Sequence, residues 1–148
     1  MRQDRQKETI KRHKTIAREF VDAINHKNWD KLDRLVATNF VRHSYAAGES
    51  KICHRDKLKE FLHRELATFP DAFERIEDIF AEGDRVAVRH QFEGTQQGWM
   101  GKYPPSGKKM KANYIAIYRI DNNQIVEAWV EWDNLHGLKQ LGHFNQAT

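Results

Sequence analysis

Residues 125–142 read IVEAWVEWDNLHGLKQLG, a strand-like run followed by a short helical segment. Side chains alternate between the two faces of a strand, so Trp129, Glu131 and Asp133 share one face, with Glu127 below them. Glu131 and Asp133 lie roughly 6.6 Å apart along an extended backbone, near enough to perturb each other's proton affinity in a dry pocket. The stretch predicts an acid-bearing inner face of a sheet, or only a polar strand side if that face meets solvent.

The first half of the chain has the periodicity of helices. Apolar residues at three-to-four spacing from Thr9 to His26 predict an amphipathic helix. Asn28 is a suitable N-cap for a shorter helix. Phe40–Tyr45 is expected to be extended, and a third helix is expected over Arg55–Thr68, before Pro70.

After Pro70 the period changes to that of strands. Four are expected, and they span Phe73–Ala81, Arg85–Gly94, Met110–Ile120 and Ile125–Trp132. Short turns between strands predict a curled antiparallel sheet, with the preceding helices packed on its concave face. The expected fold class is therefore α+β, closed by a short helix over Asn134–Leu141.

Length and composition fit one domain spanning residues 1–148, with eight Phe, four Trp and four Tyr as bulky core material. The net charge of +4 comes from 25 basic and 21 acidic residues. Basic residues gather in the first fourteen positions and around Lys108–Lys111, where they predict solvated faces. Because no RNA-binding aromatic signature accompanies them, we expect no nucleic-acid partner.

Cysteine content and hydropathy indicate the compartment. The single cysteine, Cys53, cannot form an internal disulfide, which favours a reducing environment. No apolar run approaches the length needed to cross a bilayer, and residues 1–14 contain no apolar signal segment. We therefore expect a cytoplasmic protein without membrane contacts.

Several motifs together resemble the SnoaL-like polyketide cyclases, a family of the cone-shaped NTF2-like superfamily. The match covers roughly Phe40 to Gly142. Its motifs are, in order, FPD at 69–71, AEGDRVAVR at 81–89, GTQQG at 94–98, PPSGK at 104–108, IAIYRI at 115–120 and QIVEAW…WD…L…QLG at 124–142. The resemblance implies an α+β cone with a pocket between sheet and helices. It also implies a homodimer formed through the sheet.

The resemblance further implies a reaction. Characterised cyclases of the family use an acidic residue as general acid and base in an intramolecular aldol condensation, without metal or cofactor. By its position after the Trp129 motif, Asp133 is the matching residue. The chemistry needs a base of raised proton affinity and hydrogen-bond donors for the enolate. An Asp at a strand end before a short helix is also a good N-cap, so both interpretations stay open.

Two histidines are the other candidate catalytic residues. The family frequently places a His where His43 stands, at the pocket mouth, where it would polarise a substrate oxygen. His90 shares a strand face with Val86, Val88 and Phe92, an apolar row that should face the core. A buried His is either hydrogen-bonded by a neighbour or part of the chemistry. No local spacing among these residues is typical of a metal site, so none is expected.

His90 and Glu131 depart from the family pattern and predict a more polar pocket than an aromatic polyketide favours. The expected substrate-binding side chains are Trp129, Glu131, Tyr45, Phe92, Tyr114 and Trp99. Pattern alone leaves open which face of the third strand, the one with Tyr114 or the one with Ile115, forms the pocket. Trp99 would cover the pocket entrance or pack at an oligomer contact.

The leading hypothesis is a small enzyme that closes a ring on a polyketide-like or other carbonyl substrate by acid–base chemistry. A second keeps the fold and changes the reaction to dehydration, isomerisation or hydrolysis of a small molecule. The third is a non-catalytic ligand-binding or dimerisation module. A cone interior filled by side chains would favour the third.

Overall fold

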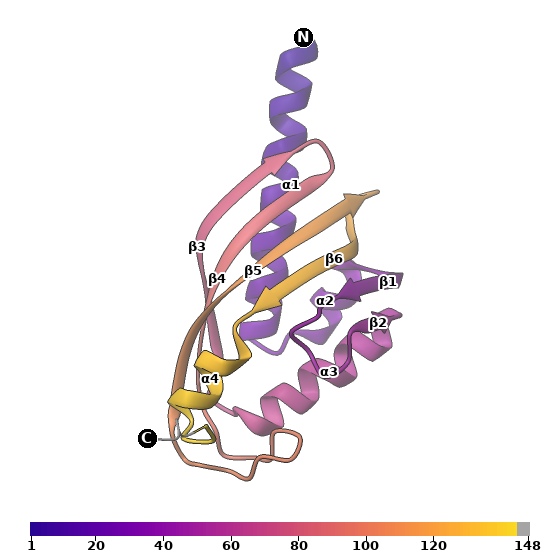
Figure 1. Cartoon of the computed structure of the whole chain (residues 1–148). Helices are drawn as coiled ribbons and strands as arrows, with labels where there is room; N and C mark the ends of the chain where they lie inside the picture. Colours follow the sequence, from indigo (N-terminus) through magenta and orange to yellow (C-terminus); the bar gives the residue numbers. More distant parts are fainter. Residues whose placement is uncertain (145–148) are drawn as a thin grey trace.

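The computed structural model describes residues 1–144, which form four helices and six strands (Figure 1). The helices are α1 (Arg2–Asn25), α2 (Trp29–Leu35), α3 (Arg55–Thr68) and α4 (Asn134–Gln140). The strands are β1 (Val36–His43), β2 (Lys51–Cys53), β3 (Phe73–Glu82), β4 (Arg85–Thr95), β5 (Lys109–Asp121) and β6 (Gln124–Trp132).

Local signals set the helix ends. Asn28 caps α2 as expected, since its Oδ1 accepts a hydrogen bond from the backbone N–H of Lys31 at 3.1 Å. The helix α3 has the predicted bounds, and the ring of His54 caps it by accepting from the N–H of Asp56 at 3.1 Å. The helix α1 begins at Arg2, earlier than the predicted Thr9, and residues 1–9 are exposed.

The sheet has the strand order β2-β1-β6-β5-β4-β3. The predicted antiparallel pairing is confirmed for β3, β4, β5 and β6. The short β2 was not predicted, and β1 pairs with β6 in parallel, Val36 opposite Ile125. A strand from the first half of the chain therefore lies beside the last one.

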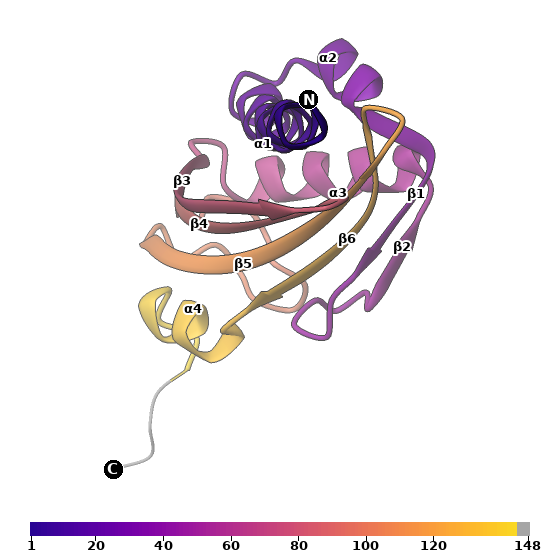
Figure 2. The same cartoon turned by 90° about the horizontal axis from the view of Figure 1, so that it is seen from above.

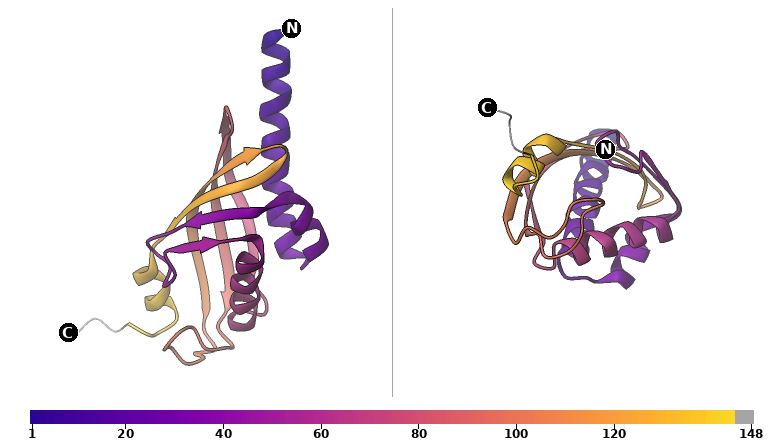
Figure 3. Two further views of the ribbon diagram at one scale, coloured as in Figure 1. Left: turned by 90° about the vertical axis from the view of Figure 1, so that its right-hand side faces the viewer. Right: turned by 60° about the horizontal axis from the view of Figure 1, so that its bottom comes forward.

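The sheet curls around α1 and α3, which lie on its concave side (Figures 2 and 3). Its inward side chains alternate along the strands and pack against the helices in one core. This core includes Val86, Val88, Ala116, Tyr118, Ala128, Ile16, Phe20, Leu58 and Leu62. The structure is thus an α+β cone. Among the described residues, no helix combines the length and apolar character needed to span a membrane.

The face assignment predicted for β6 is wrong. Ala128 and Val130 belong to the core, so Trp129 and Glu131 point to the convex side of the sheet. Glu131 is exposed there. Alternation divides the side chains of β6 into two sets but does not say which set faces the helices. In the structure, the helices cover the set that contains the small residue Ala128.

Candidate functional site

A buried polar cluster lies inside the cone, at the start of β3. Glu74 points inward, and its side chain is only 11% exposed. Asn25, at the end of α1, donates from Nδ2 to the carbonyl of Glu74 at 2.8 Å and accepts from its N–H at 2.9 Å. This pair of hydrogen bonds fixes the backbone of Glu74 against the helix.

Three aromatic side chains of β4 and β5 complete the cluster around Glu74 and His90. Tyr114 donates its hydroxyl to Glu74 Oε2 at 2.6 Å. The ring of His90 stacks on that of Tyr114, with centroids 4.3 Å apart, and its Nδ1 lies 3.6 Å from Glu74 Oε2. The hydroxyl of Tyr118 lies 2.9 Å from His90 Nε2.

The strand register brings these groups together. His90 is opposite Tyr114 in the β4–β5 ladder and opposite Ile76 in the β3–β4 ladder. Alternation places His90 on the same face as Val88 and Phe92. His90 is completely buried, as the apolar row around it predicts.

Burial sets the protonation of the histidine. It lowers the pKa of His90 to about 3, so the ring is neutral at physiological pH. The hydroxyl of Tyr118 and Nε2 of His90 share one hydrogen bond, whose direction depends on the tautomer of the ring. The other ring nitrogen, Nδ1, lies 3.6 Å from Glu74 Oε2 and has no hydrogen-bond partner among the described residues.

Two carboxyl groups share this interior. Burial raises the pKa of Glu74 to about 7, while the hydrogen bond from Tyr114 opposes the shift. Burial also raises the pKa of Glu65, on α3, to about 8; the charge of Glu74 adds to the rise and Arg42 opposes it. Near neutral pH, Glu65 is mostly protonated and Glu74 changes its charge.

Both carboxyl groups border a small cavity between α1, α3 and the start of β3. Its other lining residues are Ile24, Asn25, Leu62, Leu66, Ala72 and Phe92. The free volume is about 10 Å³, close to the least that holds one water molecule. A larger ligand enters only if lining side chains move.

Asp133 lies away from this cluster, at the junction of β6 and α4. It is the N-cap of α4, and its Oδ1 accepts from the N–H of His136 at 3.0 Å. The carboxylate is exposed and makes no hydrogen bond to the interior cluster among the described residues. The capping interpretation of Asp133 is therefore confirmed, whereas a catalytic role stays a prediction.

His43 and Trp129 lie together on the convex side of the sheet. Their rings stack with centroids 5.6 Å apart, and the guanidinium of Arg85 lies 5.1 Å from the Trp129 ring centre. His43 Nε2 is 2.7 Å from Glu127, which also accepts from Arg119 at 3.1 Å. The hydrogen bond with His43 lowers the pKa of Glu127.

The predicted site residues thus fall into separate places. His90, Phe92 and Tyr114 point into the cone, which answers the open question about the third strand. The expectation that His43, Trp129 and Glu131 line the same pocket is wrong, because they occupy the opposite face of the sheet. Tyr45 and Trp99 are 93% and 65% exposed on loops.

A family model described as SnoaL-like polyketide cyclase matches residues 14–141. The chain belongs to this family. A search of curated protein sequences found no match.

Solved structures of similar proteins agree with the SnoaL-like fold. IdmH from Streptomyces antibioticus, described as a candidate polyketide cyclase, is 26% identical with a TM-score of 0.77, over 88% of this chain and 98% of IdmH. A candidate polyketide cyclase from Bacillus cereus is 25% identical with a TM-score of 0.75, over 90% and 83% of the two chains. An LEH-like epoxide hydrolase from M. tuberculosis, at 15% identity and a TM-score of 0.72, covers 90% and 91% and shares the fold alone.

Sequence reasoning missed the two carboxyl groups of this SnoaL-like interior, although the pattern carried a signal for each. Glu65 follows Leu58 and Leu62 at helical spacing, so it continues the apolar stripe of α3. Glu74 shares a strand face with the core residue Ile76. A carboxylate in an apolar row is a candidate for a perturbed pKa.

Proposed function

We propose that this SnoaL-like protein is an acid–base enzyme that acts on a small carbonyl compound inside the cone, with Glu74 as the group that moves the proton. The carrying observation is the Glu74 carboxylate, with a pKa raised to about 7, held by Tyr114 beside His90. A general base works best when its pKa lies near the operating pH. Groups with strongly shifted pKa values gather at functional sites.

The hydrogen bonds leave one oxygen of Glu74 free for chemistry. Oε2 accepts from Tyr114, while Oε1 makes no hydrogen bond to any described residue. Oε1 is therefore the atom that takes a proton from the carbon beside a carbonyl group. Protonated Glu65, on the other side of the cavity, supplies a hydrogen-bond donor for the enolate oxygen that forms.

The reaction that fits the family best is an aldol-type ring closure. Glu74 removes the α proton, the carbanion attacks a second carbonyl carbon of the same molecule, and the resulting alkoxide takes a proton back. Membership of the SnoaL-like polyketide cyclase family supports this choice. Dehydration or isomerisation would use the same proton transfer with a different fate for the enolate.

One observation favours a non-catalytic function instead. The cavity of about 10 Å³ is too small for a polyketide, so the interior is nearly filled by its own side chains. A domain that only binds a partner needs no larger cavity. The enzyme proposal requires that side chains such as Phe92 and Leu66 move when substrate enters.

Proton exchange at carbon separates the two functions. With ethyl benzoylacetate in D₂O, we expect the protein to accelerate loss of the α-proton NMR signal, and Glu74→Gln to reduce that acceleration roughly 100-fold or more. Glu93→Gln, a carboxylate on the convex side of β4, is the matched control and should keep the wild-type rate. Exchange at the buffer rate with wild-type protein would favour the non-catalytic module.

We further propose that two copies pair through the convex side of the sheet. Phe80, Ala87, Ile117 and Trp129 are successive cross-strand partners there, and they form one row over β3, β4, β5 and β6. Phe80 is 68% exposed and Ile117 38% exposed, and the neighbouring Ile115 is 55% exposed. A contiguous exposed apolar row is typical of an interaction surface.

A further inference from the structure

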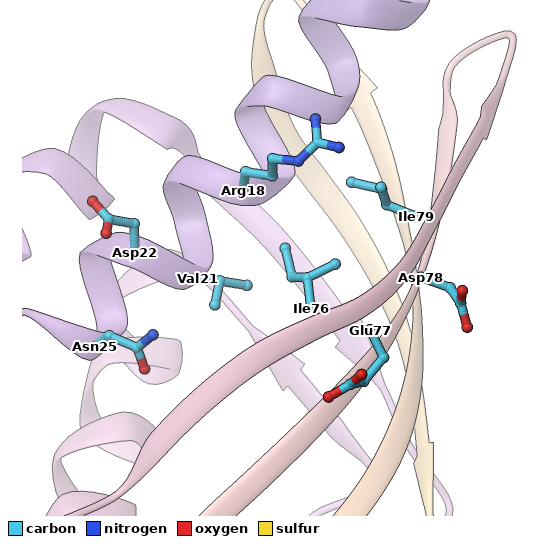
Figure 4. Close-up of a pocket in the computed structure, with 8 residues that line it drawn as sticks. All are labelled: Arg18, Val21, Asp22, Asn25, Ile76, Glu77, Asp78 and Ile79. Carbon is cyan, nitrogen blue, oxygen red and sulfur yellow. The ribbon is translucent and has the colours of Figure 1, made fainter.

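Two arginines of the cone differ in how their charge is compensated. Arg18, on α1, borders an open groove beside β3. The carboxylates of Glu77 and Asp78 lie on the side of β3 away from α1, so neither faces Arg18 across the groove (Figure 4). Arg18 is exposed, and water compensates its charge. Arg42, on β1, is only 4% exposed and lacks that compensation.

The side chain of Arg42 points into the cone. Arg42 is opposite Ile52 in the β1–β2 ladder and opposite Ala128 in the β1–β6 ladder, and both partners belong to the core. Cross-strand partners share a face of the sheet, so Arg42 extends toward the helices. Its guanidinium carbon lies 4.2 Å from the ring centre of Phe61, on α3. A cation is therefore held between β1 and α3.

The guanidinium of Arg42 has few partners for a buried cation. Its Nη2 donates to the carbonyl of Glu49 at 3.3 Å, which is longer than the usual range of about 2.7 to 3.2 Å. Its Nε is buried and has no hydrogen-bond partner among the described residues. The carboxylate of Glu49 lies 3.4 Å from Arg64 instead. Because a buried charge without an ionic partner is unfavourable, this site favours the binding of an anion.

Glu65 does not supply that anion at neutral pH. Burial raises the pKa of Glu65 to about 8, with the charge of Glu74 adding to the rise and that of Arg42 opposing it. Glu65 is therefore mostly protonated. Burial lowers the pKa of Arg42, but a guanidinium still keeps its proton. Since the charges of both Glu74 and Arg42 act on Glu65, the guanidinium lies next to the acid–base cluster.

Ser44 presents a second unpartnered group on the same side. Alternation along the extended chain places Phe40, Arg42 and Ser44 on the inner face, and all three are buried. Ser44 is 2% exposed, and its Oγ has no hydrogen-bond partner among the described residues. Most buried polar atoms in folded proteins have a partner. Two such donors, two residues apart, indicate a ligand that accepts hydrogen bonds from both.

We propose, on the basis of the function proposed above, that the substrate carries a free carboxylate besides its carbonyl group, and that Arg42 and Ser44 bind that carboxylate. Arg42 donates from Nε and from a terminal nitrogen, and the long contact with the Glu49 carbonyl is exchanged for the carboxylate. A guanidinium suits this group because its edge presents two parallel donors. An ester brings no charge to Arg42, so the site selects oxo acids over oxo esters.

Levulinate (4-oxopentanoate) and methyl levulinate test this selection, since they share a ketone and differ in the carboxylate. In ¹H–¹⁵N NMR titrations of the full chain, levulinate should shift the amide signals of Arg42 and Ser44 and the Nε–H signal of Arg42. The ester should bind at least about tenfold more weakly, as expected for the loss of a buried charge-assisted pair of hydrogen bonds. Equal affinities, or no shifts with levulinate at millimolar concentrations, would overturn the proposal.

Three variants locate the site. Ser44→Ala removes a hydroxyl without a partner, so its urea midpoint should match the wild type while its preference for levulinate over the ester falls severalfold. Arg42→Gln should abolish the preference; if this variant does not fold, Ser44→Ala decides. Arg18→Gln, the matched control, removes an exposed charge and should keep the preference. An equal loss in Arg18→Gln, or an unchanged preference in Ser44→Ala or in folded Arg42→Gln, would contradict the site.

The carboxylate site and the proposed reaction fail in different measurements. Glu74→Gln should keep the preference for levulinate, because binding does not require the proton transfer. Equal affinities for acid and ester together with normal proton exchange would refute the carboxylate site alone. Absence of exchange together with the preference would refute the reaction, and Arg42 and Ser44 would remain a ligand site.

Discussion

Asp133 shows how one side chain fits two different explanations until its contacts are known. The sequence supports a catalytic carboxylate and a helix cap equally, because both functions need an acidic residue at a strand end. The contact with the N–H of His136 establishes the cap.

The cap leads to a stability prediction. Asp133→Ala should lower the free energy of unfolding by about 1 kcal/mol, whereas Asp133→Asn should leave it nearly unchanged, because Asn caps helices as well as Asp does. Urea unfolding followed by circular dichroism measures both. If Asn were as damaging as Ala, the negative charge and not the cap would be the important feature.

The buried carboxyl groups predict the direction of the pH dependence. Their folded pKa values, about 8 for Glu65 and about 7 for Glu74, lie above the ordinary 4.5, so the folded state binds more protons between about pH 4.5 and 8. Stability from these groups therefore falls as pH rises through that window. His90, with its pKa lowered from 6.5 to about 3, acts oppositely but only below pH 6.5.

Thermal unfolding between pH 6.5 and 8 isolates the carboxyl groups. We expect the wild-type melting temperature to fall across this range, and Glu74→Gln to show a shallower fall because one of the two titrating groups is gone. Glu93→Gln should keep the wild-type slope. A melting temperature that stayed constant or rose with pH would contradict the shifted pKa values of Glu65 and Glu74.

Local sequence patterns predicted most helices and strands closely, but they did not predict how these elements are arranged in space. The helix over Arg55–Thr68 was predicted with its observed bounds because apolar spacing and Pro70 are both local signals. The three-residue strand β2 is too short for a period to appear. Which face of β6 points inward depends on which side of the sheet the helices cover. The contact between helices and sheet joins distant parts of the chain, so a local pattern does not reveal it.

The loop between β4 and β5 is tied to the end of α3. The backbone N–H groups of Gln97 and Gly98 donate to the carbonyl of Thr68 at 2.9 and 3.1 Å, and the hydroxyl of Thr68 donates to the carbonyl of Trp99 at 2.9 Å. A Cβ atom at Gly98 would collide with the carbonyl oxygen of Ala67 and lie 3.1 Å from Thr68 Cα. Only glycine lets the loop approach the helix this closely.

Gly98→Ala should therefore destabilise the protein by about 1 to 3 kcal/mol, as overpacking against a fixed backbone does. Gly48→Ala is the matched control, because no atom of residues 1–144 lies within 4 Å of a Cβ at that position. Urea midpoints of the two variants give the comparison. Equal midpoints would show that the loop moves away from α3 without loss of stability.

At the level of the assembled protein, the convex apolar row predicts association. Ile117→Glu should convert the proposed dimer to a monomer, because it places a charge in the centre of the row between Ala87 and Trp129. Light scattering coupled to size exclusion measures the mass. Lys111→Glu, an exposed change on the same strand, should leave it unchanged. A wild-type mass of one chain would refute the dimer.

The parallel pairing of β1 with β6 also determines when the sheet can be completed. One edge of residues 36–43 pairs with residues 125–129, so the intervening chain must be synthesised before that pair can form. Contacts between such distant segments slow folding, because loop closure reduces chain entropy before the contact stabilises anything. Until then β1 has β2 on one edge and an open edge on the other. During translation, this open edge can pair with another chain, which exposes the nascent protein to aggregation.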